Sequence, residues 1–286
     1  MTRCRPRDVP SAIEHSGAHH FVTHALRAAL LLAVACTSPG PAPSGDRGGP
    51  FSTDRRDFFG GSRCDTSLAF CEDFESGSLE RYEMLGDNVT VDATHAARGA
   101  RALHVRAQGS LDVELIRTRA PFPLPANSHY LRMFVYFAAL PAPPMDVNGW
   151  SLAWAQTEPS EAQYTRLGGQ FDGTNNFFAT GSAEPAITLV DADPAASPRP
   201  VPTGEWLCLE WRNDGTRHEQ HFYWDAVEHP SLTITASTPS PINPTVPYVA
   251  PRVDFVDIGW IGTVNEPVDV WIDEIAIDEQ RIGCAR

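Results

Sequence analysis

The sequence predicts an all-β fold, an antiparallel β-sandwich in a single domain that spans residues 63–286. Two observations lead to this prediction. The 25 Pro and 21 Gly favour short strands joined by turns, because Pro lacks the donor that a helix interior needs and Gly weakens a helix. Short runs of alternating apolar and polar residues also recur at regular spacing from residue 63, which is typical of a sandwich or barrel.

The expected strands follow one another with turn residues between them, and no segment keeps a helical period over more than two turns. Two Pro-rich segments, 191–204 and 236–251, interrupt the series and are expected to be loops, since strand-like runs flank both. In chain order the expected strands are residues 71–75, 82–85, 89–92, 102–107, 111–116, 130–137, 150–156, 164–171, 177–180, 186–190, 206–212, 221–225, 232–235, 253–262 and 268–277.

Alternation within a strand assigns its residues to two faces. In the run 130–137 the core face is Leu131, Met133, Val135 and Phe137. The opposite face of this run is Tyr130, Arg132, Phe134 and Tyr136. The run 206–212 likewise places opposite its apolar side the residues Trp206, Cys208, Glu210 and Arg212. Sugar-binding surfaces need this mixture, because aromatic rings cover the apolar faces of pyranoses while polar groups bind the hydroxyls.

The first 35 residues read as an export signal. An apolar segment, residues 28–35, follows Arg27 and is far too short to span a bilayer. Its ending, "LAVAC", resembles a bacterial lipobox, so Cys36 is the predicted lipidation site. Residues 36–62 then form a predicted disordered Pro/Gly/Ser tether. If Val22 is the true start, encoded by GTG, residues 1–21 are not translated.

Composition excludes several functions. The net charge of −14 repels phosphate backbones, so nucleic acid is not an expected partner. All 22 basic residues are Arg, which removes a Schiff-base lysine, a P-loop lysine and a lysine general base. We expect an exported monomer in the bacterial cell envelope or the medium, in contact with the membrane only through its lipid.

Four cysteines lie in the predicted domain, an even number that suits two disulfides in an oxidising compartment. Three pairings are possible. We favour Cys64 with Cys71, a short loop, and Cys208 with Cys284, which would fasten the last strand to a neighbour. The other pairings stay open at this point.

Six motifs resemble a known family in content and order. They are "CEDFESG", "ARGARALHVRA", "LRMFVYF", "GEWLCLEWRNDGTRHEQHFYWD", "VDFVDIGWIG" and "VDVWIDEIAIDEQRIGC". The set is similar to concanavalin A-like β-sandwich proteins of the laminin-G-like jelly-roll kind. It resembles more closely secreted bacterial lipoproteins related to the glucuronan-lyase and fungal cellulose-induced-protein group. The resemblance covers roughly Cys71 to Cys284 and implies a fold more strongly than an activity.

The resemblance implies a structural Ca²⁺ at the edge of the sandwich. Carried over, its ligands are Glu75, backbone oxygens of the 92–98 turn, and Asp273 in the final strand. Calcium requires six to eight oxygen ligands. Carboxylates that meet only in the folded state would tie the two ends of the chain together.

The resemblance also implies chemistry on a polar concave face. In a lyase, positive or polar groups neutralise a uronate carboxylate while a Tyr or His moves the C5 proton. The candidates for binding are Arg132, Tyr136, Arg166, Gln170 and Glu210. The candidates for proton transfer are Tyr136, Tyr164, His221 and Tyr223. Asn148 stands where similar lipoproteins have a His, which counts against lyase chemistry.

We therefore predict a non-catalytic protein that binds polysaccharide or another glycan. A polysaccharide lyase acting by β-elimination is the alternative, and a laminin-G-like module that binds protein is a second one. A glycoside hydrolase is disfavoured, because no strand carries a pair of carboxylates with the spacing that such enzymes use. No serine nucleophile elbow, HExxH motif or phosphate-binding loop occurs.

Overall fold

The computed structural model describes residues 49–108, 112–141, 149–158, 163–191, 199–262 and 267–286. The predicted signal segment, the lipidation site Cys36, most of the tether and Asn148 lie outside these residues. In the described part no helix is long and apolar enough to cross a membrane.

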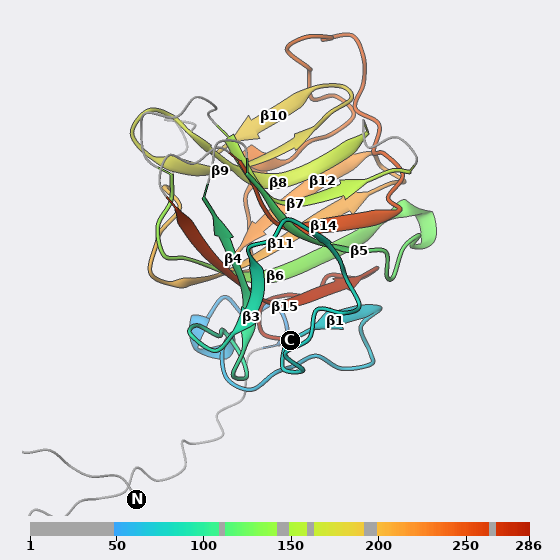
Figure 1. Ribbon diagram of the computed structural model, residues 1–286. Coiled ribbons are helices and arrows are strands. Elements are labelled where there is room, and N and C mark those ends of the chain that lie inside the picture. The colour runs from blue at the N-terminus through green and yellow to red at the C-terminus, as the bar shows by residue number, and fades with distance from the viewer. Residues whose placement is uncertain (1–48, 109–111, 142–148, 159–162, 192–198, 263–266) are drawn as a thin grey trace, which may run out of the picture. The chain divides into compact units, whose positions relative to one another are not determined.

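Within the described residues the strands form two antiparallel sheets that pack face to face (Figure 1). The eight-stranded sheet runs in the order β13 (Val227–Glu228), β12 (Glu219–Trp224), β11 (Trp206–Asp214), β6 (His129–Phe137), β15 (Val268–Asp278), β4 (Ala102–Ala107), β3 (Val89–Asp92), with β1 (Phe70–Glu72) also paired to β15. The seven-stranded sheet runs in the order β10 (Ile187–Val190), β9 (Asn176–Ser182), β8 (Tyr164–Phe171), β7 (Gly149–Gln156), β14 (Phe255–Gly262), β5 (Asp112–Thr118), β2 (Glu83–Leu85). The predicted all-β sandwich is confirmed.

One predicted strand was wrong. Residues 232–235 contribute only a single bridge, between Ile234 and Gln220. The chain reaches that bridge through a short 3-10 helix, η4 (Pro230–Leu232). Pro230 occupies the first turn of η4, where its missing N–H is tolerated, so the segment turns instead of extending along the sheet.

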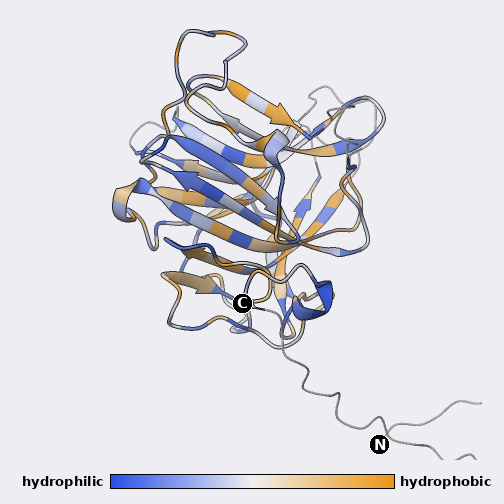
Figure 2. Cartoon of the chain, turned by 180° about the vertical axis from the view of Figure 1, so that it is seen from behind, coloured by the Kyte–Doolittle hydropathy of each residue, from blue (hydrophilic) through white to orange (hydrophobic). Residues whose placement is uncertain are grey.

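The core lies between the two sheets and is rich in aromatic rings. Trp150 of β7 stacks on Trp260 of β14, with centroids 5.4 Å apart, and contacts Phe137 of the facing sheet. The apolar side of β6 predicted from alternation is buried as expected. Figure 2 shows the hydrophilic and hydrophobic residues that alternate along several strands.

Part of the outer face of the eight-stranded sheet, around Arg132, Phe134 and Glu210, is covered by both ends of the described chain, residues 50–63 and 279–286, which we call the terminal cover. Residues Arg55–Asp57 form a 3-10 helix, η1, and the adjacent Phe58 is fully buried. Phe59 packs on Phe134 of β6, and the Ala285 amide donates to the Pro50 carbonyl at 3.2 Å. Residues 50–62, which precede the predicted boundary at residue 63, are therefore packed against the sandwich.

Two disulfides fasten this cover. Cys64 pairs with Cys71, and Cys208 of β11 pairs with Cys284 in the C-terminal tail. This is the pairing favoured from the sequence. Disulfides persist in oxidising compartments, so both bonds fit an exported protein.

His129, at the start of β6, makes the stability of the fold depend on pH. Its ring is fully buried beside Phe122 and Trp211, and burial lowers the pKa of His129 from 6.5 to about 4. Between these two pH values His129 is therefore protonated in the unfolded chain but not in the folded chain. Above about pH 6.5 this group does not reduce the free energy of unfolding. As the pH falls towards 4, the free energy of unfolding decreases by up to about 3 kcal/mol.

We expect His129→Phe to reduce this acid sensitivity, because the aromatic replacement cannot take up a proton. Urea unfolding of both proteins at several pH values between 7 and 4 measures the effect. The difference between variant and wild type isolates His129 from other groups that titrate in this range. Identical pH dependence in the two proteins would contradict the assignment.

Candidate functional site

The outer face of the seven-stranded sheet carries a line of side chains that runs across the strands. These positions are direct partners in the pairing of neighbouring strands, so they stand side by side on one face. We call this line the transverse row. From β10 to β2 its members are Thr188, Gly181, Arg166, Trp154, Asp257, Arg117 and Glu83.

An aromatic pair lies at the middle of the row. Trp154 of β7 and Tyr164 of β8 stack with centroids 4.3 Å apart and an interplanar angle of 17°. Both rings are partly exposed. They arise from neighbouring strands at diagonal positions, which long aromatic side chains can bridge. The pair forms a fixed aromatic surface of the kind that packs against the apolar face of a sugar ring.

Arg166 lies beside this pair and reaches towards the edge of the sheet. Its guanidinium donates to the Thr188 hydroxyl at 3.2 Å. The lack of a side chain at Gly181 makes room for it, since a Cβ there would stand 3.0 Å from Nε of Arg166. Burial lowers the pKa of Arg166, yet an arginine stays protonated, so the row keeps a positive charge at this position.

On the other side of the aromatic pair, Asp257 of β14 is buried, and both of its carboxylate oxygens accept hydrogen bonds. Arg117 of β5 donates to both of its oxygens, at 2.6 and 2.9 Å, and Gln156 of β7 also donates to it. The Arg117 guanidinium lies 4.0 Å above the Phe255 ring. These hydrogen bonds hold the Arg117 and Asp257 side chains in fixed positions, because a bidentate arginine–carboxylate pair restricts geometry as well as contributing stability.

A hollow of about 560 Å³ opens beside the row, at the end where β8 begins. Gln163, which precedes Tyr164, forms part of its wall. The exposed apolar residues Ile242, Val246 and Val249 line the opposite wall. The hollow extends the surface beside the aromatic pair with a mixed polar and apolar lining.

The residues predicted to bind ligand divide between the two sheets. Tyr164, Arg166 and Gln170 lie on the same outward face of β8, and Gln170 pairs with Gly149 of β7. Trp154, Asp257 and Arg117 were not among the site residues predicted from the sequence. Alternation in the run 150–156 could have placed Trp154 on an outer face, whereas the Asp257–Arg117 contact depends on pairing between strands far apart in the chain.

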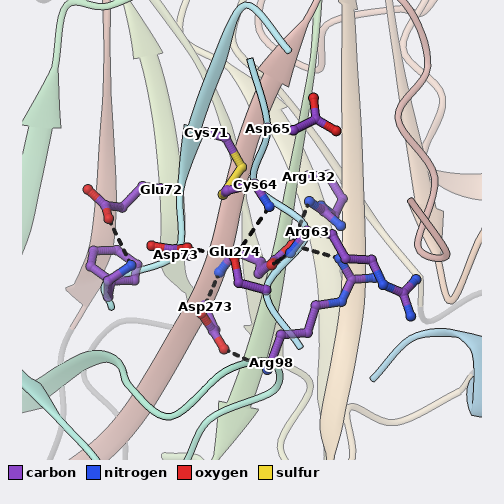
Figure 3. The surroundings of a disulfide bond; sticks show 12 residues. Arg63, Cys64, Asp65, Cys71, Glu72, Asp73, Arg98, Arg132, Asp273 and Glu274 are labelled. Atoms are coloured by element: carbon purple, nitrogen blue, oxygen red, sulfur yellow. Dashed lines mark hydrogen bonds and ion pairs between the residues drawn. A yellow bond between two sulfur atoms is a disulfide. The ribbon is translucent and has the colours of Figure 1, made fainter. Parts of the chain in front are cut away.

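Arg132 and Glu210 were predicted to bind ligand on a concave face, and the structure does not place them on an open surface. Both are fully buried under the terminal cover. Arg132 pairs with Glu274 at 3.2 Å, and Glu210 accepts the amides of Ile282 and Gly283 at 2.7 and 3.1 Å (Figure 3 shows the surroundings of Arg132). Burial lowers the pKa of Arg132. These side chains hold the terminal cover in place and cannot reach a ligand.

The structure does not bring the proposed proton-transfer residues together. Tyr136 lies on the outer face of the eight-stranded sheet, where its ring stacks on His95 at 4.3 Å. His221 is on β12 of the same sheet, with its ring nitrogens 2.8 Å from Glu228 and 3.2 Å from Glu219. Tyr223 is also on β12, and burial raises its pKa to about 12. Only Tyr164 lies on the face that carries the transverse row.

Backbone amides donate hydrogen bonds to both carboxylates that were predicted to bind calcium. Glu75 accepts the amides of Ala100 and Arg101 at 2.7 and 2.9 Å. Asp273 accepts those of Ala97, Arg98 and Glu274 at 2.7–2.9 Å. Burial raises the pKa of Asp273 to about 7.

An ionised carboxylate has about four lone-pair sites, so these amides take up part of the acceptor capacity of Glu75 and most of that of Asp273. In the described part of the chain no group of three or more His, Cys, Asp or Glu could hold a metal ion. Calcium binding stays a prediction. Thermal melts with and without a chelator test it, and an unchanged midpoint would remove it.

No family model and no curated protein match the chain. Among solved structures, the cellulose-induced protein Cip1 superposes with a TM-score of 0.59 at 20% identity, over 75% of this chain and 99% of that chain. A sialidase (TM-score 0.48, 8% identity, 75% and 19% of the two chains) and a botulinum neurotoxin type G receptor-binding domain (0.46, 10%, 76% and 49%) superpose less well. At this identity the likeness to Cip1 establishes the sandwich fold alone.

Proposed function

We propose that this protein binds a glycan along the transverse row, with Trp154 and Tyr164 against the sugar rings and Arg166 at the hydroxyl or carboxylate groups. The observation that carries the proposal is that Gly181, Arg166 and Trp154 are direct cross-strand partners on one outer sheet face, with Tyr164 stacked on Trp154. Sugar recognition uses these groups together, since the rings cover apolar faces while polar groups fix orientation.

The size of the row supports an extended ligand. Neighbouring strands lie about 4.8 Å apart, so a line across seven strands measures roughly 29 Å. Such a line accommodates several sugar units of a polysaccharide chain. The partner in this proposal is therefore a polymer that lies across the strands, and Gln170 forms the next outward position along β8.

Export is part of the proposal. The two disulfides support an oxidising compartment outside the cytoplasm. The sequence adds the lipid anchor at Cys36, which would hold the protein at the bacterial envelope. Labelling of expressing cells with a fatty-acid probe, with Cys36→Ala as control, tests the anchor separately from the glycan.

Replacement of Trp154 by Ala, or of Arg166 by Gln, is expected to weaken glycan binding at least tenfold, a change of about 1.4 kcal/mol. A glycan array identifies the ligand, and calorimetric titration of that ligand measures the affinities. Tyr130→Ala, an aromatic truncation on the opposite sheet, is the matched control and should bind as wild type does. Unchanged affinity in both row variants would refute the location of the site.

A lyase is the second candidate, favoured by Arg166 and Tyr164, which stand two residues apart on one face. The guanidinium would neutralise a uronate carboxylate while the phenol moves a proton. Incubation with uronate-containing polysaccharides, followed by ultraviolet absorbance of unsaturated products, tests it. Product formation that disappears in Tyr164→Phe would establish the lyase, whereas binding without product would establish the non-catalytic function.

A further inference from the structure

A cavity of about 410 Å³ lies at the β2–β5 edge of the seven-stranded sheet. Three arginines line it, Arg81, Arg117 and Arg119, together with Phe70, Tyr82 and Glu83. We call it the arginine pocket. The chain has a net charge of −14, so three guanidinium groups around one cavity stand out against an acidic background. Its volume falls in the range of ligand pockets, which is roughly 300–1,000 Å³.

Aromatic rings hold the three guanidinium groups in position. Arg81 lies 5.2 Å above Phe70 and 5.1 Å above Tyr82. Arg117 and Arg119 lie 4.0 and 5.3 Å above Phe255. Cation–π contacts of this kind restrict flexible side chains before a ligand arrives, which lowers the entropy lost on binding.

The acidic residues that pair with these three arginines differ in how deeply they are buried. Asp257 and Glu72 are buried beneath Arg117 and Arg81 and form part of the protein interior. Glu83 is the only acidic residue among those that line the pocket, and its side chain is 52% exposed. Glu158, which does not line the pocket and is about half exposed, also accepts a hydrogen bond from Arg119. The Glu83 carboxylate lies 3.9 Å from Arg117 and 3.7 Å from Arg119, longer than a hydrogen bond. Such exposed pairs contribute little and are readily exchanged.

We propose that the arginine pocket binds an anionic group, a carboxylate or a sulfate or phosphate ester, in the position that the Glu83 carboxylate now occupies between Arg117 and Arg119. Arginine suits these ligands because its planar fork donates two parallel hydrogen bonds to their oxygens. Arg81 faces the same cavity from the other side and adds a third positive charge. The volume leaves space for a sugar-sized group that carries the anion.

Arg117 and Glu83 belong both to this pocket and to the transverse row, but free anions test the pocket without any glycan, so failure of either proposal can be told from failure of the other. Inorganic sulfate, inorganic phosphate and sodium glucuronate are titrated separately, at constant ionic strength set with chloride, and followed by two-dimensional NMR. We expect saturable shifts near Arg119 with at least one anion. The anion that binds most tightly identifies whether an ester or a carboxylate is preferred.

Three variants make the test specific. Arg119→Gln should weaken binding at least tenfold, and Glu83→Gln should strengthen it severalfold because the competing carboxylate is gone. Arg106→Gln, a half-exposed arginine on the opposite sheet, is the matched control and should change nothing. Thermal melts confirm that each variant is folded. No saturable binding of any anion to the wild type, or equal binding in Arg119→Gln, would overturn the proposal.

Discussion

Replacement of Glu274 by Gln is expected to destabilise the protein by about 3–5 kcal/mol, because it leaves two buried guanidinium groups without their counter-charge. Glu274, Arg98 and Arg132 have fully buried side chains. Glu274 accepts from Arg98 at 2.6 Å and from Arg132 at 3.2 Å (Figure 3). Burial, together with the neighbouring Arg132, lowers the pKa of Arg98 to about 9, while Glu274 favours its charged form.

Urea unfolding of the variant and the wild type measures this loss. Glu279→Gln is the control, since it removes the same charge from an exposed position five residues further along the chain. The control should change stability by less than about 0.5 kcal/mol. Equal stabilities of Glu274→Gln and wild type would mean that the two arginines find other acceptors, and the network would then not be needed for the fold.

Removal of the Cys208–Cys284 disulfide is the second large effect. The bond closes a loop with a sequence separation of 76, whereas Cys64–Cys71 closes one of 7. Loop-closure entropy in the unfolded chain then gives about 4.5 kcal/mol for the long loop and about 2.4 kcal/mol for the short one. The double variant Cys208→Ala/Cys284→Ala should therefore be the less stable of the two.

The double variant Cys64→Ala/Cys71→Ala is the control, because it also removes one disulfide bond but opens the shorter loop. Chemical unfolding of both variants, compared with the wild type, measures the difference. A larger loss for the short loop would contradict the entropic account. The long-loop variant should also expose Glu210 and Arg132, because the tail over them loses its covalent attachment.

The sequence predicted the strands and their inner faces because alternation is a local property. The side of β6 that carries Met133 and Val135 is buried as predicted. The outer side of the same strand was predicted to be open, and this was wrong for Arg132 and for Glu210 on β11. The segments that cover them have no periodic pattern, and their contacts join the C-terminal tail to strands far away in the sequence.

The candidate site shows a second limit of sequence reasoning. Alternation places a residue on an inner or outer face but does not say to which sheet its strand belongs. Tyr136 and Tyr164 were grouped as proton-transfer residues, and they lie on the outer faces of opposite sheets. The Asp257–Arg117 contact arises because β14 pairs with both β5 and β7, a register that no local pattern contains.

The contact between Pro50 and Ala285 joins the two ends of the described chain. The described chain enters at the outer face of the eight-stranded sheet, and the transverse row occupies the outer face of the other sheet. Force applied to the described chain at residue 50 would therefore act on the terminal cover, which the Cys208–Cys284 disulfide fastens to β11. The transverse row lies on the other sheet and would not bear that force.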